Sequence, residues 1–123
     1  LVAEIVAGFV RNFDPKRERC WIAQRNGSVV GSVFLVKNSK STAKLRLLIV
    51  EPAARGLGLG RRLTRACIRF ARRAGYRKLV LWTQSHLAAA RGIYRKEGFR
   101  KVSSEKHRSF GRRLAAEVWE LKL

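Results

Sequence analysis

Glycines on alternate positions between two hydrophobic segments give this sequence its clearest chemical signal. The segment reads Arg55-Gly56-Leu57-Gly58-Leu59-Gly60 and continues with Arg61 and Arg62. Residues without a Cβ let a ligand lie directly on the main chain. The residues that follow are expected to begin a helix, whose free N–H groups and dipole attract an anion. The sequence therefore predicts a turn that binds a phosphate group, with Arg61 and Arg62 beside it.

The spacing of these glycines excludes two common phosphate-binding motifs. A P-loop ends in Gly-Lys-Ser/Thr, whereas Gly60 is followed by two arginines. A dinucleotide fingerprint has the pattern G-x-G-x-x-G, and counting from Gly56 its third glycine would fall on Arg61. The pattern that fits is R-x-x-G-x-G, formed by Arg55, Gly58 and Gly60 directly after Val-Glu-Pro. The alternative interpretation is a strand-to-helix turn that binds nothing.

Two regular elements must position this turn. The apolar run over residues 45–50 predicts a strand covered on both faces, and Pro52 ends it because proline has no N–H for a sheet. The helix after the turn is expected to end before Gly75, with an apolar face formed by Leu59, Leu63, Ala66, Phe70 and Ala74. We expect a solvated opposite face that carries Arg61, Arg62, Arg65, Arg69, Arg72 and Arg73.

The remaining pattern predicts the order α-β-β-β-α-β-α-β-β. Helices are expected over residues 1–13 and 86–96, the second capped by Ser85 and ended by Gly98. Further strands are expected over residues 19–25, 28–36, 78–83, 99–106 and 114–121, with a hairpin turn at Asn26-Gly27 and a loop over residues 107–113. The fold class is therefore α/β (α+β), with a mixed, mostly antiparallel twisted sheet and helices on both faces.

Composition limits the classes of partner. The 123 residues fit one domain, and the net charge of +20 attracts polyanions such as nucleic acid. This charge is spread along the chain, which argues against a simple nucleic-acid-binding arm. Two cysteines and two histidines lack metal-ligand spacing, so we predict no metal and no structural disulfide. With no apolar run of membrane-spanning length and no signal peptide, we expect a cytoplasmic protein without a membrane partner.

The R-x-x-G-x-G pattern after Val-Glu-Pro, together with Y-x-x-x-G-F at residues 94–99 and the order of elements, resembles the GCN5-related N-acetyltransferase (GNAT) superfamily. The resemblance covers residues 1–123 as one domain, from the second helix of that fold onward. It implies that the first strand and first helix lie upstream, in agreement with the absence of methionine. It also implies acetyl-CoA as cosubstrate, bound by Leu48, Ile49, Val50, Arg55, Gly56, Leu57, Gly58, Leu59, Gly60, Arg61, Arg62 and Ser85.

The resemblance assigns a catalytic role to Tyr94. In the family this phenol lies near the coenzyme sulfur, and a phenol with a pKa of about 10 is protonated at neutral pH and can donate to a departing thiolate. The alternative is a tyrosine packed between helix and sheet, with its hydroxyl bonded to the main chain. The family also polarises the acetyl carbonyl with main-chain N–H groups of the central strand, here near residues 48–50.

The general base stays unassigned. Many relatives carry a glutamate at the start of the central strand, where this sequence has Ser41, Thr42, Ala43 and Lys44. Gln84 stands where many relatives place an asparagine. The remaining acidic candidates are Glu51 and Glu117, and for both a surface glutamate paired with arginine is the simpler interpretation.

Further stretches narrow the resemblance. F-D-P-K-R-E-R-C-W-I-A, A-K-L-R-L-L-I-V-E-P and H-R-S-F-G are similar to the acetyltransferase half of bacterial proteins in which a MarR-type winged-helix regulator precedes a GNAT domain. This kinship implies a DNA-binding domain upstream. The expected function is acetyl transfer from acetyl-CoA to a primary amine of a small molecule or protein. A non-catalytic CoA-sensing module and a basic nucleic-acid-binding domain are the alternatives.

Overall fold

The computed structural model describes residues 2–85, 87–109 and 112–123, and its elements follow the predicted order. They are α1 (Val2–Arg11), β1 (Arg19–Arg25), β2 (Ser28–Lys37), β3 (Thr42–Val50), the 3-10 turn η1 (Pro52–Ala54), α2 (Leu59–Arg73), β4 (Lys78–Gln84), α3 (Ala88–Lys96), β5 (Arg100–Ser109) and β6 (Arg112–Lys122). Leu1, His86, Phe110 and Gly111 lie outside the described residues, and with them part of the predicted N-terminal helix, helix start and Ser-Phe-Gly loop.

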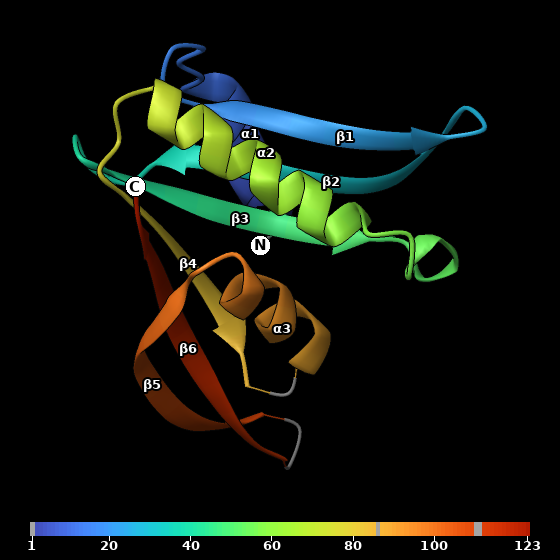
Figure 1. Cartoon of the computed structure of the whole chain (residues 1–123), viewed down its shortest axis with the longest axis vertical. Helices are drawn as coiled ribbons and strands as arrows, with labels where there is room; N and C mark the ends of the chain where they lie inside the picture. Colours follow the sequence, from blue (N-terminus) through green and yellow to red (C-terminus); the bar gives the residue numbers. More distant parts are fainter. Residues whose placement is uncertain (1, 86, 110–111) are drawn as a thin grey trace.

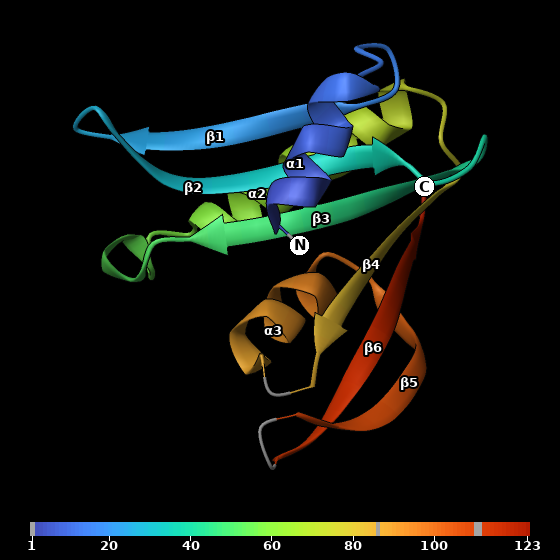
Figure 2. The ribbon, with the colours of Figure 1, turned by 180° about the vertical axis from the view of Figure 1, so that it is seen from behind.

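The strands form one sheet in the order β1-β2-β3-β4-β6-β5. Among the described residues, β3 and β4 are the only neighbours that run parallel. Helices α2 and α3 lie on one face of the sheet, and α1 crosses the other face (Figures 1 and 2). This arrangement confirms the predicted mixed, mostly antiparallel sheet with helices on both faces.

Two local predictions depended on turn chemistry. Asn26 and Gly27 have φ values of 52° and 80°, which confirms the tight hairpin between β1 and β2. The predicted loop over residues 107–113 is wrong at both ends, because the pairing of β5 with β6 continues to Ser109↔Arg112. The polar, charged sequence hid these strand ends, since a two-stranded ribbon beyond the sheet does not need an apolar face.

The core lies between α2 and the central strands, and Val33, Leu35, Cys67, Ala71, Leu79 and Leu81 are completely buried there. The predicted apolar face of α2 is correct at Leu63 but otherwise shifted. Residues that are buried on this helix are Gly60, Leu63, Thr64, Cys67, Ile68 and Ala71, whereas Leu59, Ala66, Phe70 and Ala74 are half-buried. Thr64 tolerates burial because its hydroxyl donates to the Gly60 carbonyl oxygen at 2.7 Å.

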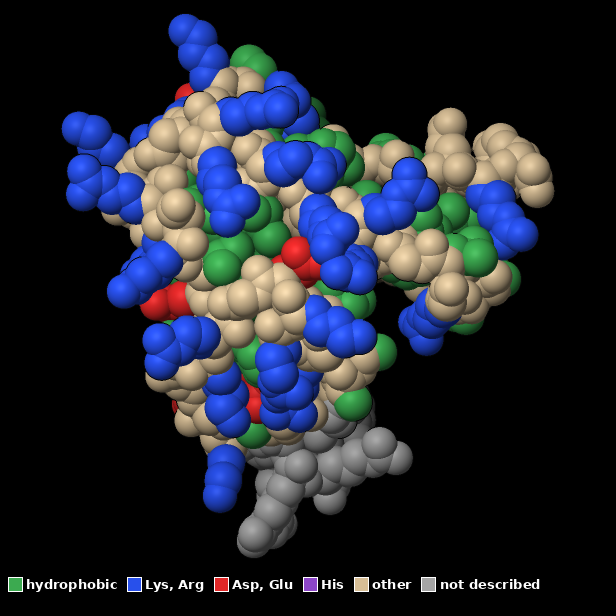
Figure 3. Space-filling view, in the orientation of Figure 1, with side chains coloured by type: hydrophobic (Ala, Val, Ile, Leu, Met, Phe, Trp, Pro, Cys, Tyr) green, Lys and Arg blue, Asp and Glu red, His purple; other side chains and the backbone are tan. Residues whose placement is uncertain are grey.

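The arginines of α2 are exposed, as expected. Figure 3 shows Lys and Arg side chains spread across the face that carries α2 and α3, not gathered into one patch. On this face the positive charge is therefore distributed and does not form a single basic patch.

Candidate active site

The turn between β3 and α2 presents main-chain N–H groups without a protein acceptor. In the part of the chain that the structure describes, no oxygen accepts a hydrogen bond from the N–H groups of residues 56–61, and Arg62 N donates to Gly58 O at 3.1 Å. Gly56 and Gly58 have φ values of +85° and +75°, which favour glycine, and a Cβ at either would meet nothing within 4 Å. The turn therefore has both the donors and the open space that an anion requires.

The third glycine, Gly60, is explained by helix packing and not by an open ligand site. A Cβ on Gly60 would lie 2.9 Å from Ile93 Cδ1, so the missing side chain leaves room on α2 for the flexible end of Ile93 of α3. The same two helices are joined by Glu97, whose Oε1 lies 2.9 Å from Nε of both Arg61 and Arg65. Gly60 and the Arg61 side chain thus hold the helix that presents the turn, while their N–H groups stay unpaired.

Two other arginines border the turn. Arg55 donates from Nε to the Val50 carbonyl oxygen at 3.4 Å, which ties the turn to the end of β3. Arg62 is exposed, and no carboxylate of the described residues lies within 4.0 Å of it. Its guanidinium is therefore free to face an anion in the turn.

Strands β3 and β4 pair only over their first halves. The parallel register runs from Thr42↔Lys78 to Leu45↔Leu81 and goes no further among the described residues. Leu47 has a φ of +53°, at the register shift between β2 and β3. A non-glycine residue in this region costs about 1–2 kcal/mol, and such strain often marks functional sites. This kink at Leu47 lies just beyond the last pair of β3 with β4, where the two strands diverge (Figure 1).

The diverging half of β3 has donors that face the gap. Glu51 N donates to Val30 O of β2 at 2.8 Å. Because successive strand residues direct their N–H groups to alternate sides, Leu48 and Val50 direct theirs away from β2. The prediction that both faces of this strand are covered by other elements is wrong for its second half, where Ile49 is 52% exposed.

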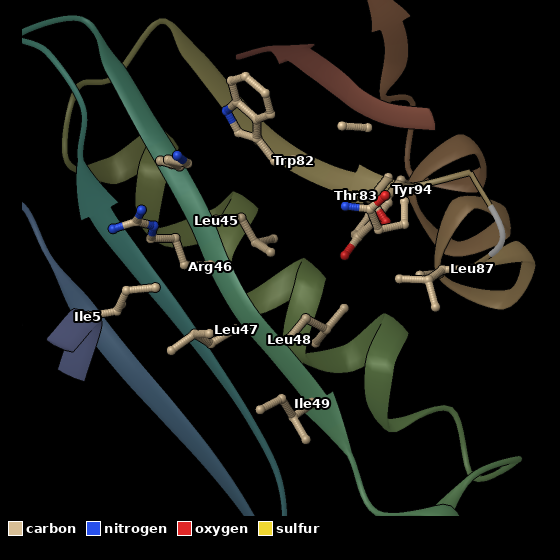
Figure 4. Close-up of a pocket in the computed structure, with 14 residues that line it drawn as sticks. Ile5, Leu45, Arg46, Leu47, Leu48, Ile49, Trp82, Thr83, Leu87 and Tyr94 are labelled. Carbon is tan, nitrogen blue, oxygen red and sulfur yellow. The ribbon is translucent and has the colours of Figure 1, made fainter. Parts of the chain in front are cut away.

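A cavity of about 430 Å³ occupies the opening (Figure 4). It is lined by Ile5 of α1, residues 44–49 of β3, residues 82–84 of β4, Ala116 of β6, and Leu87, Ala90 and Tyr94 at α3. Its inner wall contains Tyr94, which is 5% exposed and packs against Phe99 with ring centroids 5.7 Å apart. No described group hydrogen-bonds the Tyr94 hydroxyl, so the expected main-chain bond of a purely structural tyrosine is not seen. Burial, followed by the charge of Cys67, raises the pKa of Tyr94 to about 12.

Ser85 does not cap α3, and that prediction is wrong. The helix begins after Leu87 without a side-chain cap, and the Ser85 hydroxyl oxygen instead accepts a hydrogen bond from Ala115 N at 3.0 Å. The main chain of Ser85 also pairs with Ala115 at 2.8 Å, since β4 extends its pairing with β6 to this point. The hydroxyl proton stays available to a ligand, so coenzyme contact by Ser85 remains a prediction.

Neither acidic candidate lies in the cavity. Glu51 is exposed at the end of β3. Glu117 is 2% exposed and belongs to an ion-pair network, with Oε1 3.0 Å from Arg91 Nε and 3.1 Å from Trp119 Nε1, and Oε2 3.7 Å from Lys101 Nζ. This network joins α3, β5 and β6 beneath the helix. The described residues that line the cavity include no aspartate or glutamate.

Sequence reasoning missed the charged and aromatic residues of the outer cavity wall. Lys44, Arg46 and Trp82 line it, and Lys44 Nζ lies 5.5 Å from the centroid of the Trp82 ring. The signal was present in the alternation of β3, where Lys44 and Arg46 interrupt apolar residues on every second position.

The described residues were also compared with the requirements of a metal site and of a membrane-spanning helix. They contain no group of three or more His, Cys, Asp or Glu side chains placed to hold a metal ion. None of their helices combines the length and the apolar character needed to cross a bilayer. Cys20 and Cys67 are both free thiols.

Comparison with known proteins agrees with this geometry. The model of the acetyltransferase (GNAT) family matches residues 4–99. Mycothiol acetyltransferase from Beutenbergia cavernae is 31% identical over 93 residues, which cover 74% of this chain and 31% of that protein. The chain spans between 31% and 54% of the length of the first curated relatives that it matches.

Solved structures give the same result. Ribosomal-protein-alanine N-acetyltransferase from Brucella melitensis has a TM-score of 0.82 at 25% identity, covering 98% of this chain and 78% of that one. A GNAT family acetyltransferase from Elizabethkingia anophelis with acetyl-CoA bound shares the fold, with a TM-score of 0.78 at 19% identity over 98% and 82% of the two chains. Since the family model covers most of the sequence, the chain belongs to the GNAT family of acetyltransferases.

Proposed function

We propose that residues 1–123 form an N-acetyltransferase domain that transfers an acetyl group from acetyl-CoA to a primary amine. One observation carries this proposal. The unpaired N–H groups of residues 56–61 follow directly after β3, the same strand that diverges from β4 at the cavity of Tyr94. Acetyl-CoA has a diphosphate at one end and a thioester at the other, so this arrangement fits both of its ends.

The turn and the strand edge would bind different parts of the coenzyme. The N–H groups of Gly56, Leu57, Gly58, Leu59, Gly60 and Arg61 would donate to the diphosphate, with the Arg62 and Arg55 side chains at its border. The pantetheine arm would lie along the free edge of Leu48, Ile49 and Val50. Charge-assisted hydrogen bonds of this kind contribute about 1.5–3 kcal/mol each.

The chemistry is a direct acyl transfer. The neutral amine attacks the thioester carbonyl carbon, a C–N bond forms and the C–S bond breaks. One amine proton passes to solvent, the departing sulfur takes a proton from Tyr94, and solvent returns a proton to Tyr94. The N–H groups of Leu48 and Val50 face the gap and would stabilise the negative charge that develops on the carbonyl oxygen. Binding of both reactants in one cavity would lower the entropic cost of bringing the amine to the thioester.

Tyr94 would donate to the departing sulfur. Its pKa of about 12 keeps the phenol protonated at all physiological pH values. Full proton transfer to a thiolate with a pKa of about 8.5 is uphill, but the same buried surroundings also raise the pKa of the thiol. A covalent acyl-enzyme is not needed, and burial raises the pKa values of both Cys67 and Cys20, which lowers their nucleophilicity.

The test is turnover with a panel of amines. Purified protein with acetyl-CoA should release free thiol and form an acetylated amine detected by mass spectrometry. Tyr94→Phe should lower kcat by about 100-fold with little change in the KM for acetyl-CoA. Tyr76→Phe is the matched control, because the Tyr76 hydroxyl donates to Arg17 O at 2.8 Å, outside the cavity lining. Equal loss of kcat in both variants would contradict the role of Tyr94.

A CoA-sensing module is the second candidate, favoured by the lack of a carboxylate among the described cavity residues. It predicts binding of acetyl-CoA without thiol release from any amine. As a further part of the proposal, similarity to MarR–GNAT regulators supports a bacterial, cytoplasmic protein with an upstream DNA-binding domain. Binding of a longer polypeptide to operator DNA, modulated by acetyl-CoA, would test that part.

A further inference from the structure

The cavity has an outer wall with a chemistry unlike that of the inner one. Arg46 and Ile5 lie on one side of β3, whereas Tyr94 and Leu87 lie on the other (Figure 4). Lys44 and Arg46 alternate with Ala43 and Leu45, which are buried in the core beneath α2, so their side chains lie on the opposite face of the sheet. This is the face that α1 crosses (Figure 2). A coenzyme bound at the α2 turn would therefore leave this outer entrance to the second substrate.

Two cations at this entrance lack a compensating charge. No carboxylate of the described residues lies within 4.0 Å of Lys44 or Arg46, and the described cavity lining has no acidic side chain. Both side chains are half-buried. Burial, and then the neighbouring Arg46 charge, hold the pKa of Lys44 below its usual value. The two charges therefore raise each other's free energy until an anion reaches them.

A simple ammonium ion fits this entrance poorly, because two like charges repel it. An amine that carries its own anionic group fits well, since Lys44 and Arg46 would bind the anion. The exposed ring of Trp82, 57% accessible and next to Lys44, adds an apolar surface for the rest of such a molecule. A cavity of about 430 Å³ lies in the range typical of small-molecule sites.

Resting on the proposed function, we infer that the acceptor is a small anionic amine, whose carboxylate or phosphate is bound by Lys44 and Arg46 and whose apolar part packs on Trp82. The positive charge also lowers the pKa of the acceptor ammonium, which increases the fraction of neutral amine. A larger fraction of neutral amine partly replaces the removal of the amine proton by a carboxylate base. Lys44 and Arg46 are thus specificity-determining residues.

The test compares related acceptors with and without an anionic group, at a pH where each amine's neutral fraction is known and corrected for. Thiol release at saturating acetyl-CoA is measured with phenylalanine, phenylalaninamide and phenethylamine, and separately with phosphoethanolamine and ethanolamine. The first series tests a carboxylate, and the second tests a phosphate. We expect kcat/KM to favour the anionic member of at least one series by tenfold or more, a preference that weakens as salt is added.

Variants then assign the preference to residues. Arg46→Gln and Lys44→Gln should each reduce the preference for the anionic acceptor by about five- to tenfold, mainly through the acceptor KM. Arg25→Gln is the matched control, because it removes the same charge from an exposed position at the end of β1. Equal kcat/KM for the anionic and neutral acceptors in both series, or a preference that survives both variants, would overturn the inference.

A separate measurement distinguishes failure of the inference from failure of the proposed function. If no amine is acetylated, calorimetry with CoA present compares N-acetylphenylalanine with its amide as ligands of the same cavity. Tighter binding of the carboxylate, lost in Arg46→Gln but kept in Arg25→Gln, would support the anion site without catalysis. Equal binding of both ligands would overturn it.

Discussion

Replacement of Gly58 by aspartate tests the phosphate-binding turn with little risk to the fold. Gly58 is the N-cap residue of α2, with a φ of +75°, and a Cβ at this position would meet no heavy atom within 4 Å. Aspartate tolerates positive φ better than most residues and is a preferred N-cap, so we expect a change in unfolding free energy of no more than about 1 kcal/mol. Its carboxylate would occupy the free N–H groups and repel a diphosphate.

The size of the effect follows from two contributions. Two unit charges about 4 Å apart interact by about 4 kcal/mol at an effective dielectric constant of about 20, and by about 1 kcal/mol in bulk water. A hydrogen bond to a charged group contributes a further 1.5–3 kcal/mol, roughly. A combined loss of about 3 kcal/mol in a salt-containing buffer corresponds to an affinity for CoA about 150-fold weaker.

The matched control is Gly27→Asp. Gly27 has a φ of +80°, its Cβ position is equally open, and it lies in the hairpin turn between β1 and β2. The two variants therefore share the change in net charge and the free-energy cost of an aspartate at positive φ. Calorimetry with CoA at fixed ionic strength, supported by thermal unfolding, measures both. Affinities of the two variants within threefold of each other would refute the assignment of the turn.

Three further predictions concern the surrounding residues. The pKa of Tyr94 is about 12 in the folded protein and about 10 in the unfolded chain, so the folded state holds this proton more tightly. The protein should therefore lose about 3 kcal/mol of stability between pH 10 and pH 12. In a denaturant titration, Tyr94→Phe should lack this loss. Glu117→Gln should lower the unfolding free energy by about 3 kcal/mol while CoA affinity stays unchanged; a stable variant without turnover would instead indicate a catalytic base. Gly60→Ala should change the unfolding free energy by no more than about 1 kcal/mol, because the added Cβ meets only the flexible end of the Ile93 side chain and alanine favours a helix over glycine; a loss of about 3 kcal/mol in a denaturant titration would contradict this.

The order of elements could be predicted because apolar periodicity and turn residues agreed along the chain. The strand bounds of β1 and the hairpin at Asn26-Gly27 came directly from the alternation and the turn pair. The apolar stripe of α2 was misplaced because apolar residues stand on two adjacent faces of this helix, and the face with Cys67, Ile68 and Ala71 is the buried one. Thr64 was missed because side-chain type alone does not show that its hydroxyl donates to the Gly60 carbonyl oxygen inside the helix. A polar residue can be buried where a local hydrogen bond to the main chain satisfies its side chain, and residue type alone does not show this.

The glycine-rich turn and Tyr94 could be singled out from spacing, but the shape of the site between them could not. The kink at Leu47 has no compositional signal, since leucine rarely adopts positive φ. The outer wall of Lys44 and Arg46 resembles an ordinary solvated strand surface until the divergence of β3 from β4 makes it the wall of a cavity. Tertiary pairing, not local sequence, decides both features.

A crystal structure of this chain with CoA bound would test the coenzyme site most directly. We expect diphosphate oxygens within about 3.2 Å of main-chain N–H groups of residues 56–61, with the pantetheine arm along Leu48 and Val50 and the sulfur beside the Tyr94 hydroxyl. A diphosphate bound instead in the groove between α2 and β1, against Trp21 and Arg69, would contradict this assignment.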